Sequence, residues 1–185
     1  PLHAPGHLIV DRQGGIYFTD AAVLTLENAV RVAGSVYYLS AQRTLTRLPI
    51  ALSTPAGIAL SPNEKTLYLT CADSRDVMAY SLEGVGLPGK GKVLGKRAKR
   101  DDVPSHAVGG LAVDPRGNVY VANVAARAIR VFNSEGAQLG LISLPDAPLA
   151  CALAGAEGKT LFVTTRHTLY KVQLENGPGL ALIEK

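Results

Sequence analysis

The sequence predicts an all-β fold, a β-propeller with about four four-stranded blades, because one strand–turn–strand pattern occurs four times. Each occurrence has a short apolar strand, a polar turn and a second apolar strand with an aromatic residue, at residues 8–20, 58–71, 111–123 and 152–165. The aromatic residues are Tyr17, Tyr68, Tyr120 and Phe162, which by subtraction of their numbers are 51, 52 and 42 residues apart. A four-stranded blade takes ~40–50 residues, whereas a coil of a β-solenoid, the alternative, usually takes ~20–30. The spacing therefore favours the propeller.

The turns and the residues between the hairpins agree with this interpretation. The four turns contain Asp, Asn, Gly or Pro, which tolerate or preset the dihedral angles of turns. Alternating residues at 36–39, 77–82, 129–132 and 168–172 predict a third strand in each blade, and residues 44–48 and 138–142 predict outer strands. Residues 23–31 are the one stretch that could be helical, although their β-branched side chains fit a strand or loop equally well. The residues after Leu174 are expected to form a polar tail.

Composition excludes several classes of protein. The chain is 47% hydrophobic and 18% charged, which is typical of soluble globular proteins, and no run reaches the ~18 apolar residues of a membrane span. Basic residues between Lys90 and Arg100 supply much of the formal net charge of +4. Because no aromatic residue is interleaved with them, they indicate a solvated loop rather than a nucleic-acid site. Cys71 and Cys151 have no C-x-x-C spacing, which argues against a zinc cluster and leaves cytoplasmic, periplasmic and secreted locations open.

Four phrases carry a family resemblance. Residues 15–20, 55–69, 110–122 and 158–164 occur in an order and at a spacing that resemble the SMP-30/gluconolactonase/luciferin-regenerating family. The resemblance implies a sugar-lactone hydrolase built on a six-bladed propeller. We therefore expect residues 1–185 to form a single β-propeller domain that belongs to a larger chain or assembly, with about two further blades before Pro1.

The resemblance also implies a metal site, which this sequence does not reproduce. Members of the family hold Ca²⁺ or Zn²⁺ on the propeller axis with a Glu from an early blade, two Asn and an Asp, which precede the innermost strands. The matching positions here are Gly6, Ala56 and Gly109, with Ala150 taken as a fourth. None of these residues has a side-chain oxygen, the kind of ligand that a hard cation prefers. We therefore expect no metal or other cofactor at a site of the family type.

Three polar residues remain as candidates for a pocket. His7 and His106 lie near the starts of innermost strands, where an imidazole could act as a base or a ligand. Asp20 ends a second strand, where it could orient a neighbouring group or cap the strand.

Three hypotheses about function follow. The first is a diverged family member that has lost the metal and binds a small molecule or a partner. The second is a non-catalytic interaction propeller within an assembly. The third is an active lactone hydrolase whose site is rebuilt around His7 and His106.

Overall fold

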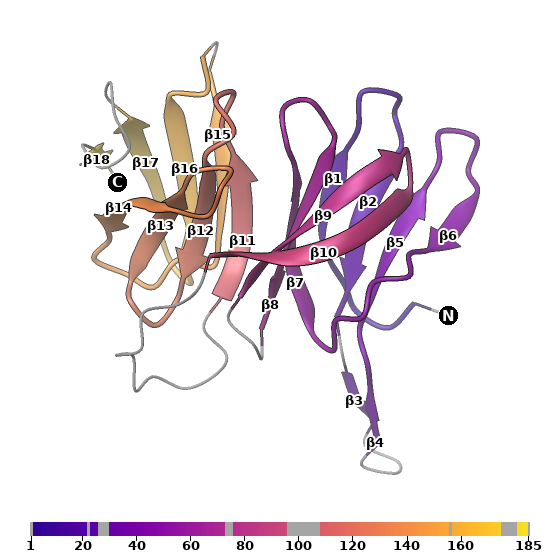
Figure 1. Cartoon of the computed structure of the whole chain (residues 1–185). Helices are drawn as coiled ribbons and strands as arrows, with labels where there is room; N and C mark the ends of the chain where they lie inside the picture. Colours follow the sequence, from indigo (N-terminus) through magenta and orange to yellow (C-terminus); the bar gives the residue numbers. More distant parts are fainter. Residues whose placement is uncertain are drawn as a thin grey trace.

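The chain forms four antiparallel four-stranded sheets that stand side by side as propeller blades in a computed structural model (Figure 1). The structure describes residues 2–21, 23–25, 30–72, 76–95, 108–155, 157–174 and 181–184. Within these ranges there is no helix, and so none that could cross a membrane. The prediction of an all-β propeller fold is therefore confirmed.

Each blade is a meander in which successive strands are neighbours. Blade one has the order β1 (Pro5–Val10), β2 (Ile16–Asp20), β5 (Ser35–Leu39) and β6 (Leu45–Arg47). Blade two comprises β7 (Pro55–Leu60), β8 (Thr66–Cys71), β9 (Val77–Gly84) and β10 (Leu87–Gly95). Blade three comprises β11 (Val108–Val113), β12 (Val119–Asn123), β13 (Ala128–Phe132) and β14 (Gln138–Ser143). Blade four comprises β15 (Ala150–Ala154), β16 (Thr160–Thr164), β17 (Leu169–Leu174) and β18 (Ala181–Glu184).

Apolar side chains fill the three spaces between neighbouring blades. Successive strand residues point to opposite faces of a sheet, so each blade offers one set of side chains to the blade before it and another to the blade after it. The aromatic residue of each second strand faces the following blade: Tyr17, Tyr68 and Tyr120 are buried in the three clusters between blades. Phe162 of blade four has no following blade in the described chain and is half-buried.

The structure decides between alternatives that the sequence left open for residues 23–31, and it corrects two other details. Of the helix, strand and loop alternatives for residues 23–31, the strand is confirmed by β3 (Val23–Thr25) and β4 (Val30–Val32), which pair as a hairpin that projects from blade one (Figure 1). Residues 26–29 lie outside the described residues. The first basic residues of the charged segment, Lys90 and Lys92, lie on β10 and not in a loop. The tail after Leu174 includes β18, which completes blade four.

Two aspartates that begin turns serve those turns. Asp11 accepts hydrogen bonds from the amides of Gln13 and Gly15, and Asp114 accepts them from the amides of Arg116 and Asn118. This Asx-type bonding replaces the strand pairing that the backbone gives up in a turn. Both carboxylates are thereby assigned a structural role.

Candidate functional site

The innermost strands β1, β7, β11 and β15 lie next to one another around the propeller axis and begin at the same end of it. In the first three blades the pairing of the innermost strand slips by one residue near its start, as in a β-bulge. The slip sets two residues of the innermost strand opposite one residue of the second strand. These pairs are Gly6 and His7, Ala56 and Gly57, and Gly109 and Gly110, which face Thr19, Thr70 and Ala122 respectively.

A threonine hydroxyl joins blade one to blade two and blade two to blade three. Thr19 Oγ1 accepts the amide of His7 (3.1 Å) and donates to the carbonyl of Ala56 in blade two (2.8 Å). Thr70 Oγ1 accepts the amide of Gly57 (2.7 Å) and donates to the carbonyl of Gly109 in blade three (3.0 Å). We call the contact between the innermost strands of two neighbouring blades at this position a joint, so the four blades have three joints.

The third joint, between blades three and four, has no such hydroxyl because Ala122 stands at the equivalent position. Here the amide of Gly110 donates directly to the carbonyl of Leu149 (2.9 Å). The backbones of blades three and four therefore meet without an intervening side-chain atom.

The positions that match the family's metal ligands do not fit a metal ion. Gly6, Ala56 and Gly109 supply no side-chain oxygen, and a Cβ added to Gly109 would collide with the carbonyl oxygen of Leu149. Across the described part of the chain, no three His, Cys, Asp or Glu side chains gather closely enough to hold a metal ion.

Ala150 is not equivalent to the other three positions. In blade four the amide of Leu149 donates to the carbonyl of Thr164 (2.7 Å), Ala150 pairs with Thr164, and Cys151 pairs with Val163 as Leu111 pairs with Val121. Counted from these pairs, Ala150 corresponds to Gly110, and Leu149 corresponds to Gly109. The expectation of four equivalent positions was therefore wrong by one residue in blade four.

His7 is the one candidate side chain that the structure places at the axis. Its Cε1 lies 3.0 Å from the position that a Cβ of Gly110 would occupy, so the imidazole of blade one lies against the bare backbone of blade three. Burial lowers the pKa of His7 below its ordinary value of 6.5, which keeps the ring neutral at pH 7. His106, the second candidate, lies outside the described residues.

Asp20 lies beside the axis but is engaged by backbone groups. Its buried carboxylate accepts the amides of His3 (3.0 and 3.1 Å) and Ala4 (2.6 Å), and His3 Nδ1 lies 3.5 Å from Oδ2. This arrangement holds the segment that leads into β1, and it corresponds to the strand-capping interpretation.

The environments of the two cysteines do not favour a nucleophilic role. Cys71 is buried next to Thr54, and burial raises the pKa of Cys151 to about 12, which disfavours the nucleophilic thiolate.

Sequence reasoning missed the bridging threonines, although a signal was present. The residue two positions after the aromatic is threonine in Tyr17-Phe-Thr, Tyr68-Leu-Thr and Phe162-Val-Thr, but alanine in Tyr120-Val-Ala. This single break in the repeat marks the joint that lacks a hydroxyl.

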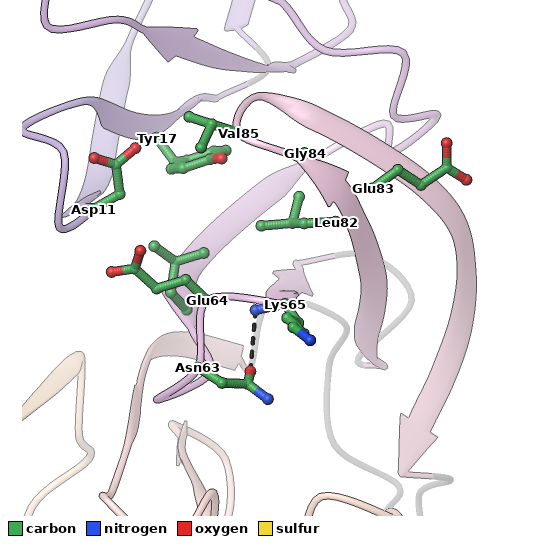
Figure 2. Close-up of a pocket in the computed structure, with 10 residues that line it drawn as sticks. Asp11, Tyr17, Asn63, Glu64, Lys65, Leu82, Glu83, Gly84 and Val85 are labelled. Atoms are coloured by element: carbon green, nitrogen blue, oxygen red, sulfur yellow. Dashed lines mark hydrogen bonds between the residues drawn. The ribbon is translucent and has the colours of Figure 1, made fainter.

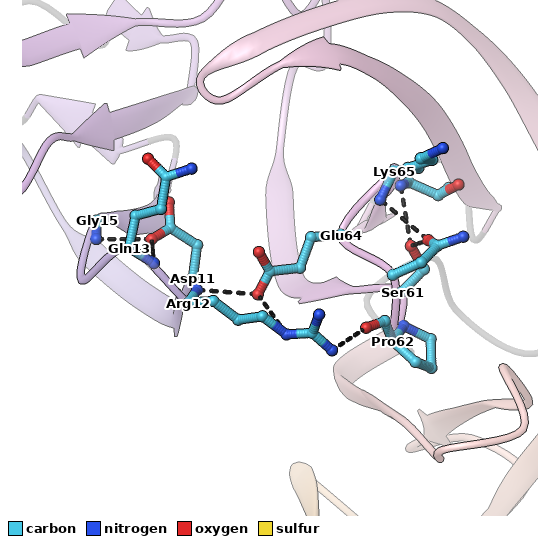
Figure 3. Close-up of polar contacts among 10 residues, drawn as sticks. Asp11, Arg12, Gln13, Gly15, Ser61, Pro62, Glu64 and Lys65 are labelled. Atoms are coloured by element: carbon cyan, nitrogen blue, oxygen red, sulfur yellow. Dashed lines mark hydrogen bonds and ion pairs between the residues drawn. The ribbon is translucent and has the colours of Figure 1, made fainter.

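Pockets in the described chain lie at the end of the blades opposite the joints, beside the turns that connect the first and second strands. One of about 390 Å³ is lined by Arg12, Pro62, Asp114, Leu153 and neighbouring residues. Another of about 300 Å³ lies between the turns of blades one and two and the tip of the β9–β10 hairpin (Figure 2). Next to them, Arg12 donates to Glu64 through its amide and to the carbonyl of Pro62 through its guanidinium, which ties the two turns together (Figure 3).

Comparison with known proteins identifies the family of the chain. Residues 2–167 match the family described as the SMP-30/Gluconolactonase/LRE-like region, so the chain belongs to a family of lactonase-type propellers. It is 32% identical over 182 residues to a gluconolactonase of Zymomonas mobilis, covering 93% of this chain and 51% of that protein. It is 30% identical to the lactonase drp35 of Staphylococcus aureus, covering 95% of this chain and 52% of that protein. The chain thus spans about half the length of these relatives.

Solved structures show the same fold. A gluconolactonase from Xanthomonas campestris superposes with a TM-score of 0.78 at 27% identity, over 94% of this chain and 58% of that one. A calcium-binding regucalcin from Agrobacterium tumefaciens superposes with a TM-score of 0.70 at 21% identity, over 88% of this chain and 53% of that one. The second likeness concerns the fold alone.

Proposed function

We propose that this member of the lactonase-type family has given up the family's metal-dependent hydrolysis and uses the mouth of its propeller axis to bind a small molecule or a partner. One observation carries the proposal: positions 6, 56 and 109 have no side-chain oxygen, and position 109 has no room for a side chain. A hard cation needs several oxygen ligands, and the described residues at the axis offer none from these side chains.

Metal titration and a lactonase assay test the proposal together. The chain is titrated with Ca²⁺, Zn²⁺ and Mn²⁺ in a calorimeter, and hydrolysis of a sugar δ-lactone is followed with each metal and with a chelator. We expect no saturable binding at micromolar metal, and no hydrolysis that a chelator removes. Metal-dependent hydrolysis above the spontaneous rate would refute the proposal.

A second candidate function is lactone hydrolysis in which His7 replaces the metal. The observation that favours it is the neutral imidazole lying at the axis, because a neutral imidazole can accept a proton from water. The water oxygen would add to the lactone carbonyl, the ring C–O bond would break, and the ring oxygen would take up the proton. This candidate requires hydrolysis that a chelator leaves unchanged and that His7→Gln abolishes. Equal rates in the two proteins would exclude it.

A further inference from the structure

The third joint lacks the threonine hydroxyl that bridges the first two joints, and this difference affects the space available at position 109. This inference rests on the proposed function, since it concerns why the axis excludes a metal ligand. We infer that Ala122, by replacing a bridging threonine, lets the third joint close, and that the closed joint excludes any side chain at position 109.

The first step is the equivalence of the groups that meet at each joint. The donors are the amides of the second residue in each slipped pair, and the acceptors are carbonyls at the start of the next blade's innermost strand. In the first two joints donor and acceptor bond to one threonine oxygen and not to each other. In the third joint the Gly110 amide and the Leu149 carbonyl bond directly at 2.9 Å. A hydroxyl bridge adds one atom between the two backbones, and its removal lets them approach.

The second step is the space left for a side chain. Position 56, at a bridged joint, carries the methyl group of Ala56. A Cβ added to Gly6, at the other bridged joint, would meet only Thr19 Oγ1 at 3.5 Å, an ordinary contact. A Cβ added to Gly109 would meet the Ala122 methyl at 3.4 Å and would collide with the Leu149 carbonyl oxygen. Positions 6 and 56, at the bridged joints, thus admit a side chain, whereas position 109, at the unbridged joint, does not.

The consequence is a coupling between two residues that sequence comparison would treat separately. The acidic ligand that the family places at position 109 cannot return by one substitution, because the carbonyl of Leu149 fills its place. Its return also requires a residue that reopens the joint, which the first two blades identify as threonine.

A double-mutant cycle tests the coupling without reference to activity. The melting temperature is measured for the unmodified chain, Gly109→Asp, Ala122→Thr and the double variant. We expect Gly109→Asp to lower the melting temperature by roughly 5 °C or more, because overpacked sites typically cost about 1–3 kcal/mol. The double variant is expected to regain at least half of that loss. Gly109→Ala, which adds only a methyl group, serves as the milder variant should Gly109→Asp fail to fold, and we expect Ala122→Thr to rescue it as well.

The matched control is Ala56→Asp, which places the same carboxylate at the equivalent position of a bridged joint. It should lower the melting temperature by less than half as much as Gly109→Asp. Equal effects of the two Asp variants, or additive effects of Gly109→Asp and Ala122→Thr, would overturn the inference. Metal binding by the unmodified chain is a separate readout: it would overturn the proposed function and leave the outcome of the cycle to decide the coupling.

Discussion

The hydroxyl of Thr70 lies 3.0 Å from the carbonyl oxygen of Gly109, so a side chain of blade two holds the innermost strand of blade three. Thr70 Oγ1 also accepts a hydrogen bond from the amide of Gly57 at 2.7 Å, and Thr70 is fully buried. Replacing this threonine by valine keeps the shape but leaves a buried donor and a buried acceptor without their partner. We predict that Thr70→Val lowers the free energy of unfolding by about 2 kcal/mol, measured by urea denaturation.

The control for this prediction is Thr164→Val in blade four. Thr164 occupies the equivalent position, but its hydroxyl is exposed and contacts only the Ala150 carbonyl of its own blade at 3.4 Å among the described residues. Surface replacements of this kind usually change stability by less than about 0.5 kcal/mol. Similar losses in both variants would mean that the effect belongs to the residue type and not to the joint.

The tip of the β9–β10 hairpin gives a second prediction. Gly86 has a positive φ of 69°, its amide donates to Tyr17 Oη at 2.7 Å, and a Cβ there would lie 2.6 Å from the ring of Tyr38. In Gly86→Ala the added methyl group disfavours the left-handed backbone conformation and collides with the ring of Tyr38, so both effects destabilise the native hairpin. We expect the free energy of unfolding to fall by about 2 kcal/mol or more.

Gly84→Ala is the matched control because it lies two residues away on the same hairpin. A Cβ at Gly84 would meet Leu87 Cδ1 at 3.2 Å, the end of a flexible side chain that can turn aside. Its cost should stay below about 1 kcal/mol. If Gly86→Ala leaves the free energy of unfolding unchanged, the contacts of the hairpin tip with Tyr17 and Tyr38 of blade one do not contribute to stability.

The hairpins could be predicted from the sequence because apolar alternation, turn residues and one aromatic residue per repeat all indicate the same strands. Strand β10 could not, since Lys90, Gly91 and Lys92 are unusual in strands. An outer strand accepts lysine because one side of it faces solvent. Gly91 fits for a different reason: the ring of its pairing partner Tyr80 occupies the place of a side chain.

The candidate site was predictable in composition but not in geometry. The sequence alone shows that positions 6, 56 and 109 have no side-chain oxygen. The contact between Gly109 and Leu149 depends on the register slip near the start of β11, which decides where Gly109 lies against blade four. Such a slip changes neither the hydrophobic pattern nor the turn residues, so only the folded structure reveals it.

Tyr38 provides a third prediction, in alkaline solution. Its hydroxyl donates to Asp11 Oδ2 at 2.9 Å, and burial together with this hydrogen bond raises the pKa of Tyr38 to about 12. Above pH 10 the unfolded chain releases this proton while the folded chain keeps it. The contribution of Tyr38 to stability is therefore complete below pH 10 and is lost as the pH rises toward 12. We predict that the urea midpoint falls less steeply between pH 9.5 and 11.5 in Tyr38→Phe than in the unmodified chain.

Tyr37→Phe controls for the loss of one hydroxyl in the same strand. Tyr37 stacks on Phe18 with ring centroids 5.4 Å apart, on the face of blade one that is turned away from blade two. The change in steepness in Tyr38→Phe should exceed any change in Tyr37→Phe. Parallel profiles for Tyr38→Phe and the unmodified chain would remove the link between the Asp11 contact and alkaline stability.

His7 provides the last prediction, in acid solution. Because burial lowers its pKa below 6.5, the unfolded chain takes up a proton at a higher pH than the folded chain does. The stability of the unmodified chain should therefore decrease as the pH falls from 7 through 6.5, until the folded-state pKa is passed. In His7→Gln this part of the pH dependence disappears, and urea denaturation at half-unit steps from pH 7.5 to 5 measures it. His167→Gln, on an exposed turn, removes a histidine elsewhere and should keep the acid dependence. If His7→Gln keeps it too, the imidazole is not held against Gly110 in the folded protein, and the candidate hydrolysis through a neutral His7 loses its physical basis.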